Sequence, residues 1–94
     1  MKKLSIIIPA FNEENYISKL LESVHSVDTE KIGFNKEIIV VDDGSTDQTL
    51  KLTQEAAVKF PKISVIHKEN QGKGKAVQTG IKEAKGDFVL VQDA

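Results

Sequence analysis

Four short apolar segments, rich in isoleucine and valine, most constrain how this chain can fold. They cover residues 4–8, 38–41, 63–66 and 88–91, and their apolar residues are nearly continuous rather than alternating with polar ones. Continuous runs of this kind are typical of parallel strands that other structure covers on both faces. The pattern therefore predicts four buried strands in one parallel sheet.

The segments between the predicted strands have the periodicity of helices. The first places apolar residues on one helical face over residues 17–24, and we expect Asn12 to cap its start, with acidic residues in the first turn. The second follows Ser45 and Gln48, which have the spacing of a capping box, and should end near Pro61. Each of these two helices thus has a predicted N-terminal signal.

The third predicted helix covers residues 75–85, and Gly86 stands where a left-handed C-terminal cap is usual. Strands and helices then alternate as β-α-β-α-β-α-β, and right-handed crossovers put helices on both faces of the sheet. The expected fold class is α/β, with a Rossmann-like parallel sheet. Ninety-four residues suffice for one such domain and are too few for two, so we expect a single unit over residues 1–94.

Charge and cysteine content exclude several classes of partner and site. The 13 basic and 14 acidic side chains give a formal net charge of -1, so no long-range field attracts nucleic acid, which is not an expected partner. The absence of cysteine excludes a disulfide framework and fits a reducing compartment. No apolar run approaches the ~20 residues that span a bilayer. We expect a cytoplasmic protein, and any attachment at the cytoplasmic face of a membrane would come from sequence outside this chain.

Residues that could bind a ligand, such as carboxylates, lysines and amides, follow the predicted strands directly. They lie at residues 9–13, 42–47 and 70–75 and at Asp93, one group after each strand. In open parallel sheets, ligands bind beyond the carboxyl ends of the strands, where the strand order reverses. Four stretches that are distant in sequence are therefore expected to meet at one edge of the sheet.

Two adjacent carboxylates, Asp42 and Asp43, follow the second predicted strand. One of them could accept hydrogen bonds from the N–H groups of a nucleobase or from ribose hydroxyls. Alternatively the segment only forms a turn, because Asp, Gly and Ser favour turns for local reasons. These two residues alone leave both interpretations open.

The first strand ends at Pro9, which cannot donate to the sheet, and is followed by the ring of Phe11 and the carboxylate of Glu13. The ring could face a base, and the carboxylate could reach ribose or base donors. The simpler alternative is that Phe11 fills the core while Asn12 caps a helix.

The last two stretches could meet a diphosphate and its metal ion. Residues 70–75 join a strand to a helix, so backbone N–H groups and lysines there could bind phosphate, although two lysines in a solvated loop are the simpler alternative. The stretch matches neither the Walker loop nor the dinucleotide fingerprint. Asp93 could bind a divalent cation through oxygen, but one carboxylate is too few for a metal site.

Taken together, these stretches resemble family 2 glycosyltransferases, an inverting family with a GT-A fold, and above all the dolichyl- and undecaprenyl-phosphate sugar transferases. The motifs are PAFNEE at 9–14, VVDDGSTD at 40–47, NQGKGKA at 70–76 and VQDA at 91–94. The resemblance covers the whole chain. It implies a metal-dependent transferase that moves a sugar from a UDP- or GDP-linked donor to a lipid phosphate, a saccharide or another hydroxyl.

The resemblance also implies a set of nucleotide-binding residues. These are Pro9, Phe11 and Glu13 in the nucleoside pocket, Asp42 and Asp43 on the base and ribose, and Gly72 and Lys73 near the diphosphate. Asp93 resembles the first acid of the D-x-D motif, whose acids hold Mg²⁺ or Mn²⁺ on the diphosphate.

The second acid of that motif would follow Ala94, and the acceptor-binding half with its general base would lie further on. We therefore expect a truncated GT-A domain that contains the nucleotide-binding half. Its catalytic residues would lie beyond Ala94. Such a chain should be inactive by itself, and it should self-associate through the uncovered fourth strand.

Three other functions compete with this interpretation. A dehydrogenase-type dinucleotide domain would have glycines in the first strand-to-helix turn, and that turn has none. A signalling receiver module would have an Asp after the third strand, where His67 and Lys68 stand instead. A nucleotide-binding or interaction domain without catalysis stays open.

Overall fold

The computed structural model describes all residues 1–94, and it contains every strand and helix that the sequence predicts. The strands are β1 (Lys2–Ala10), β2 (Phe34–Asp43), β3 (Ile63–Lys68) and β4 (Phe88–Val91). The helices are α1 (Ile17–Ser26), α2 (Thr49–Lys59) and α3 (Lys73–Glu83), and a short 3₁₀ helix, η1 (Thr29–Ile32), precedes β2. None of the three α-helices has the length and apolar character needed to cross a lipid bilayer.

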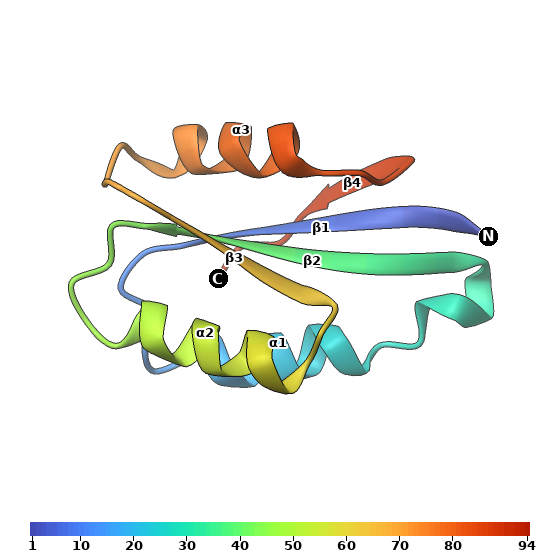
Figure 1. Ribbon diagram of the computed structural model, residues 1–94, viewed down its shortest axis with the longest axis horizontal. Coiled ribbons are helices and arrows are strands. Elements are labelled where there is room, and N and C mark those ends of the chain that lie inside the picture. The colour runs from blue at the N-terminus through green and yellow to red at the C-terminus, as the bar shows by residue number, and fades with distance from the viewer.

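All four strands are parallel, in the order β3-β2-β1-β4. The chain moves outward from β1 to β2 and β3, then returns to the opposite side of β1 to form β4. Helices α1 and α2 lie on one face of the sheet and α3 lies on the other, as Figure 1 shows. This arrangement confirms the predicted Rossmann-like α/β fold, and it places the reversal of strand order between β1 and β4.

The two faces of the sheet carry separate apolar clusters, because successive residues of a strand point to opposite faces. Toward α1 and α2, Ile6, Ile8, Ile38 and Val40 pack with Ile17 and Leu21 of α1. Toward α3, Ile7, Ile39 and Val41 pack with Ala76. Both alternating sets of side chains are therefore buried, which is why the strand sequences are continuously apolar.

Strands β1 and β2 are longer than their apolar runs. They pair from Lys2 opposite Phe34 to Ala10 opposite Asp42. Ladder pairing needs only backbone N–H and C=O groups, so strands extend into polar sequence that an apolar pattern does not detect.

The helix ends differ from the sequence predictions. Helix α1 begins at Ile17 without a side-chain cap, and Asn12 instead adopts a left-handed conformation with φ 50°. Ser45 and Gln48 form no capping box, because the Ser45 hydroxyl accepts a hydrogen bond from the Asn12 backbone at 2.9 Å. The predicted caps were wrong because bonds between the two loops take the place of local ones.

Gly86 is not the left-handed cap that the sequence predicts. Helix α3 ends at Glu83, and its C-terminal cap is Ala84 in an extended conformation. A Cβ atom at Gly86 would lie 2.5 Å from the Ser5 hydroxyl oxygen of β1. Glycine is therefore needed here because a side chain would clash with β1, and not because the backbone is left-handed.

Candidate functional site

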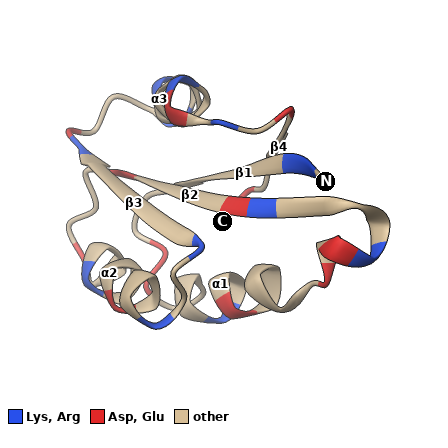
Figure 2. Ribbon diagram, turned by 45° about the vertical axis from the view of Figure 1, so that its right-hand side comes forward, with Lys and Arg blue, Asp and Glu red and all other residues tan.

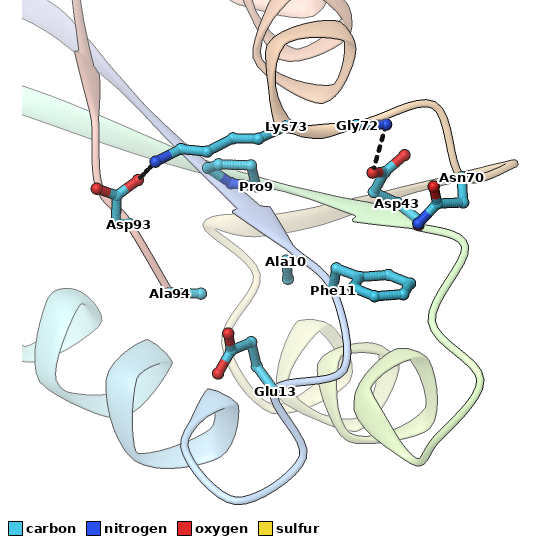
Figure 3. Close-up of a pocket in the computed structure, with 10 residues that line it drawn as sticks. All are labelled: Pro9, Ala10, Phe11, Glu13, Asp43, Asn70, Gly72, Lys73, Asp93 and Ala94. Atoms are coloured by element: carbon cyan, nitrogen blue, oxygen red, sulfur yellow. Dashed lines mark hydrogen bonds and ion pairs between the residues drawn. The ribbon is translucent and has the colours of Figure 1, made fainter.

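A cavity of about 500 Å³ lies at the carboxyl ends of the strands. Its walls come from the ends of β1, β2 and β4 and from the loop that enters α3 (Figure 3). The residues that line it are Pro9, Ala10, Phe11, Glu13, Asp43, Asn70, Gly72, Lys73, Asp93 and Ala94. Its volume lies within the range of about 300 to 1,000 Å³ that is usual for small-molecule sites.

Every predicted site residue except Asp42 lines this cavity. The four stretches therefore meet at one edge of the sheet, as the sequence predicts. The cavity also includes Asn70, which sequence reasoning did not select although it begins the predicted phosphate loop. Its side-chain amide donates to the Asp43 backbone carbonyl at 3.1 Å, a contact across 27 positions that no local pattern reveals.

Asp43 joins the end of β2 to the loop before α3. Its Oδ1 accepts the Gln71 N–H at 2.9 Å and its Oδ2 accepts the Gly72 N–H at 3.0 Å, while Lys68 Nζ lies 3.3 Å from Oδ1. Burial raises the pKa of this carboxyl, but these donors outweigh burial and hold the pKa below its ordinary value of 3.8. Asp43 is therefore an ionised, buried anchor in the wall of the cavity.

Asp42, to which the resemblance assigns a contact with the base or ribose, does not line the cavity. Its side chain is 0% exposed, and its Oδ2 bonds to His67 Nδ1 at 2.8 Å and accepts the Ser45 N–H at 3.3 Å. Neighbouring residues of a strand point to opposite faces, so the Asp42 side chain points away from the face on which Asp43 meets the loop before α3. Asp42 instead joins β2 to β3 and to the turn before α2.

Phe11 and Glu13 form the part of the wall that comes from the first loop. The Phe11 side chain is 45% exposed, which excludes the interpretation that it fills the core. Glu13 has its backbone N–H fixed to Thr49 Oγ1 at 2.8 Å, and Figure 3 shows its carboxylate pointing toward Ala94. An aromatic face and a carboxylate are thus presented together at the cavity.

Lys73 and Asp93 form an ion pair at the opposite side of the cavity (Figure 3). Lys73 is the first residue of α3, and it follows Gly72, whose φ is 98°. The chain has no group of three or more His, Cys, Asp or Glu side chains that could hold a metal ion. Asp93 therefore fits a metal site only as one ligand among several.

Comparison with known protein families identifies the family of this chain. The sequence profile described as Glycosyl transferase family 2 matches residues 5–94. The chain belongs to glycosyltransferase family 2. All residues of the cavity lie within the matched range, so the site is part of the domain that defines the family.

Individual glycosyltransferases are similar to this chain over nearly its whole length. Poly(ribitol-phosphate) β-N-acetylglucosaminyltransferase TarS of Staphylococcus aureus is 41% identical over 95 residues, which cover 100% of this chain and 16% of TarS. Dolichol-phosphate mannosyltransferase of Pyrococcus furiosus is 39% identical over 92 residues, which cover 98% of this chain and 25% of that protein. The chain thus spans a quarter or less of the length of these two relatives.

Solved structures of similar proteins have the same fold. Mannosyltransferase PcManGT of Pyrobaculum calidifontis, in complex with GDP-Man and Mn²⁺, superposes with a TM-score of 0.84 at 27% identity, over 98% of this chain and 27% of that one. TarS of S. aureus in complex with UDP-GlcNAc gives a TM-score of 0.82 at 41% identity, over 97% of this chain and 26% of that one. The sheet and helices therefore have the fold of about a quarter of these glycosyltransferase chains.

Proposed function

We propose that this chain binds the donor nucleotide in an enzyme that transfers a sugar from a nucleoside-diphosphate sugar to an acceptor. The observation that carries the proposal is the cavity at the reversal of strand order, into which four family motifs bring an aromatic ring, carboxylates and a lysine. The UDP-GlcNAc and GDP-Man complexes of similar proteins support a nucleoside-diphosphate sugar as the ligand class.

Two sets of residues in the cavity would contact two different parts of the ligand. Phe11, Glu13 and Asp43 would contact the nucleoside, because an aromatic face suits a base and carboxylates accept hydrogen bonds from base and ribose donors. Gly72 and Lys73 would contact the diphosphate, because N–H groups at the start of α3 and an ammonium group both favour negative charge.

In this proposal, an acceptor hydroxyl or lipid phosphate attacks the anomeric carbon and the nucleoside diphosphate leaves, in one displacement with inversion. A divalent cation, Mg²⁺ or Mn²⁺, with Asp93 as one of its ligands, would offset the negative charge that develops on the departing diphosphate. Lys73 lies beside Asp93 and adds its own positive charge at the same side of the cavity. The residues described here would thus bind and orient the donor rather than activate the acceptor.

Titration calorimetry with UDP, GDP, NAD and a short DNA duplex tests this proposal directly. In the presence of Mn²⁺, we expect the chain to bind UDP or GDP at least about tenfold more tightly than NAD or the duplex, a difference of about 1.4 kcal/mol. The surface gives no reason for duplex binding, since Figure 2 shows acidic and basic residues interspersed over the ribbon. Tight binding of NAD or of DNA without a response to UDP or GDP would reject the proposal.

We also propose that the isolated chain self-associates through β4. The strand has a partner on one side only, β1, and its residues Phe88, Val89, Leu90 and Val91 are 41% to 51% exposed. Exposed apolar side chains along an open sheet edge favour pairing with another copy.

Light scattering should therefore detect dimers or larger species that the substitution Leu90→Lys converts toward monomers. The matched control is Val58→Lys on α2, because Val58 is an isolated apolar residue that is 86% exposed. We expect this control to associate like the unmodified chain. A monomeric unmodified chain at high concentration, or equal effects of the two substitutions, would contradict the role of β4.

A further inference from the structure

Two loops at the edge of the cavity are joined by a reciprocal set of hydrogen bonds, which we call the inter-loop clasp. It consists of residues 12–14, between β1 and α1, and residues 45–49, which form the loop between β2 and α2 and the first residue of α2. From the first segment, the N–H groups of Asn12, Glu13 and Glu14 donate to Ser45 Oγ at 2.9 Å, Thr49 Oγ1 at 2.8 Å and Asp47 Oδ2 at 3.3 Å. In return, the N–H groups of Thr46 and Gln48 donate to Asn12 Oδ1 at 2.8 Å and Glu14 Oε2 at 3.0 Å.

Thr49 is the best-defined member of the clasp. It is fully buried, although it is a polar residue at the start of a helix. Its hydroxyl oxygen accepts the Glu13 N–H, and its hydroxyl donates to Asp47 Oδ1 at 2.6 Å. A single side chain thus connects the backbone of the first loop to a carboxylate of the second.

Asn12 supplies the second distinctive feature of the clasp. It has φ 50° and is the one non-glycine residue of the chain with a positive φ. Asparagine tolerates this left-handed conformation better than most residues, but the conformation still costs free energy. Hydrogen bonds on both its backbone N–H and its side-chain Oδ1 hold it there, which is typical of loops whose shape serves a site.

The clasp lies between cavity-lining residues of the loop after β1 and a cavity-lining residue at the end of β2. Phe11 directly precedes Asn12, Glu13 is itself a member, and Asp43 lies two positions before Ser45. Apart from the clasp, the loop after β1 is connected to the rest of the fold through β1 and through α1, which packs against the core. Because the clasp joins the two loops directly, it fixes the Phe11 ring and the Glu13 carboxylate relative to the Asp43 carboxylate.

We infer that Thr49 and Asn12 are positioning residues, which set Phe11 and Glu13 at the separation from Asp43 that a nucleoside requires. This inference rests on the proposed function. Neither side chain lines the cavity, so each would act through its neighbours and not through contact with the ligand. The clasp thereby pre-organises the nucleoside wall before any ligand arrives.

Substitution at Thr49 tests this inference with a conservative pair. Thr49→Val preserves the side-chain shape but removes the oxygen that accepts the Glu13 N–H, whereas Thr49→Ser preserves that oxygen. In calorimetry with UDP and GDP, we expect Thr49→Val to bind about tenfold more weakly than the unmodified chain and Thr49→Ser to remain within about threefold. Amide hydrogen exchange should show the Glu13 N–H losing protection in Thr49→Val and keeping it in Thr49→Ser.

Asn12→Gly provides a second test that avoids backbone strain. Glycine adopts a positive φ freely, so this variant removes the Oδ1 acceptor without opposing the loop conformation. We expect weaker UDP or GDP binding by about tenfold, while the control Asn15→Gly, an exposed position of the same loop, binds like the unmodified chain.

The outcomes separate this inference from the proposed function. If the unmodified chain binds UDP or GDP, and Thr49→Val and Asn12→Gly bind them within twofold of it, the positioning role is overturned and the proposed function stands. If the unmodified chain binds no nucleoside diphosphate, the proposed function and this inference both fall. A lower melting temperature without a change in affinity would assign the clasp to stability alone and would also overturn the inference.

Discussion

Replacing Asp43 with alanine should weaken nucleotide binding and destabilise the chain at the same time. The substitution removes the acceptor of the Gln71 and Gly72 N–H groups and the partner of Lys68. Hydrogen bonds to a charged group typically contribute about 1.5 to 3 kcal/mol, so we expect a loss of that size in the free energy of unfolding. UDP or GDP affinity should fall at least about tenfold, because the cavity loses a carboxylate and the loop with Gly72 is released. Urea denaturation and calorimetry measure the two effects.

The pH dependence of the loss in unfolding free energy shows whether the ionised Asp43 carboxylate is its cause. The folded-state pKa of Asp43 lies below the ordinary value of 3.8, so its stabilising contribution is present above pH 3.8 and is lost as the pH falls through the folded-state pKa. The difference in unfolding free energy between the unmodified chain and Asp43→Ala should therefore be constant near neutral pH and shrink below pH 3.8. The control is Asp28→Ala, since Asp28 is exposed. Unchanged stability and affinity in Asp43→Ala would contradict the anchoring role.

The sheet could be predicted from sequence because burial of the strands on both faces requires continuously apolar segments. Ile6 and Ile8 face α1 and α2 while Ile7 faces α3, and together they give one uninterrupted apolar run. The order of alternating strands and helices then implied the crossovers and the edge where ligands bind. The polar ends of β1 and β2 were missed because their pairing depends on backbone groups alone.

The helix starts could not be predicted, because long-range bonds replace the local ones that sequence patterns describe. Asn12 and Ser45 both have residue types that cap helices, and each was assigned a cap within its own loop. In the structure, Asn12 bonds to Ser45 and Thr46 instead, across 33 and 34 positions. Capping rules consider only neighbours in sequence, so they cannot detect two loops that satisfy each other.

At the site, the motifs predicted the edge of the sheet at which the cavity lies, but not the orientation of every side chain. Asp42 and Asp43 were treated as a pair, although adjacent positions of a strand face opposite sides. Asp43 lines the cavity and Asp42 is buried against His67. The alternation was available in the sequence, but the deciding fact, that β2 continues through Asp43, was not.

Replacing Gly44 with alanine should cost more stability than the same change at Gly33, and it alone should impair the site. Both glycines have a positive φ, 72° and 85°, so alanine opposes the backbone conformation at each, at a cost of about 1 to 2 kcal/mol. At Gly33 the added Cβ meets nothing within 4 Å, whereas at Gly44 it would lie 2.6 Å from the Asn70 backbone nitrogen. Overpacking of this kind adds about 1 to 3 kcal/mol, so we expect a total loss of about 2 to 5 kcal/mol for Gly44→Ala.

The close approach of Gly44 to Asn70 also explains why Gly44→Ala should weaken ligand binding. Asn70 begins the loop that carries Gly72 and Lys73 into the cavity, and Asp43, next to Gly44, anchors that loop through Gly72. A Cβ atom at residue 44 must push this loop outward, away from the position in which it presents Lys73 and the start of α3 to a diphosphate. Calorimetry should therefore record a loss of UDP or GDP affinity for Gly44→Ala and none for Gly33→Ala, which lies at the opposite end of β2. Equal losses of stability and affinity in the two variants would show that backbone conformation alone, and not the packing of the loop against β2, controls the site.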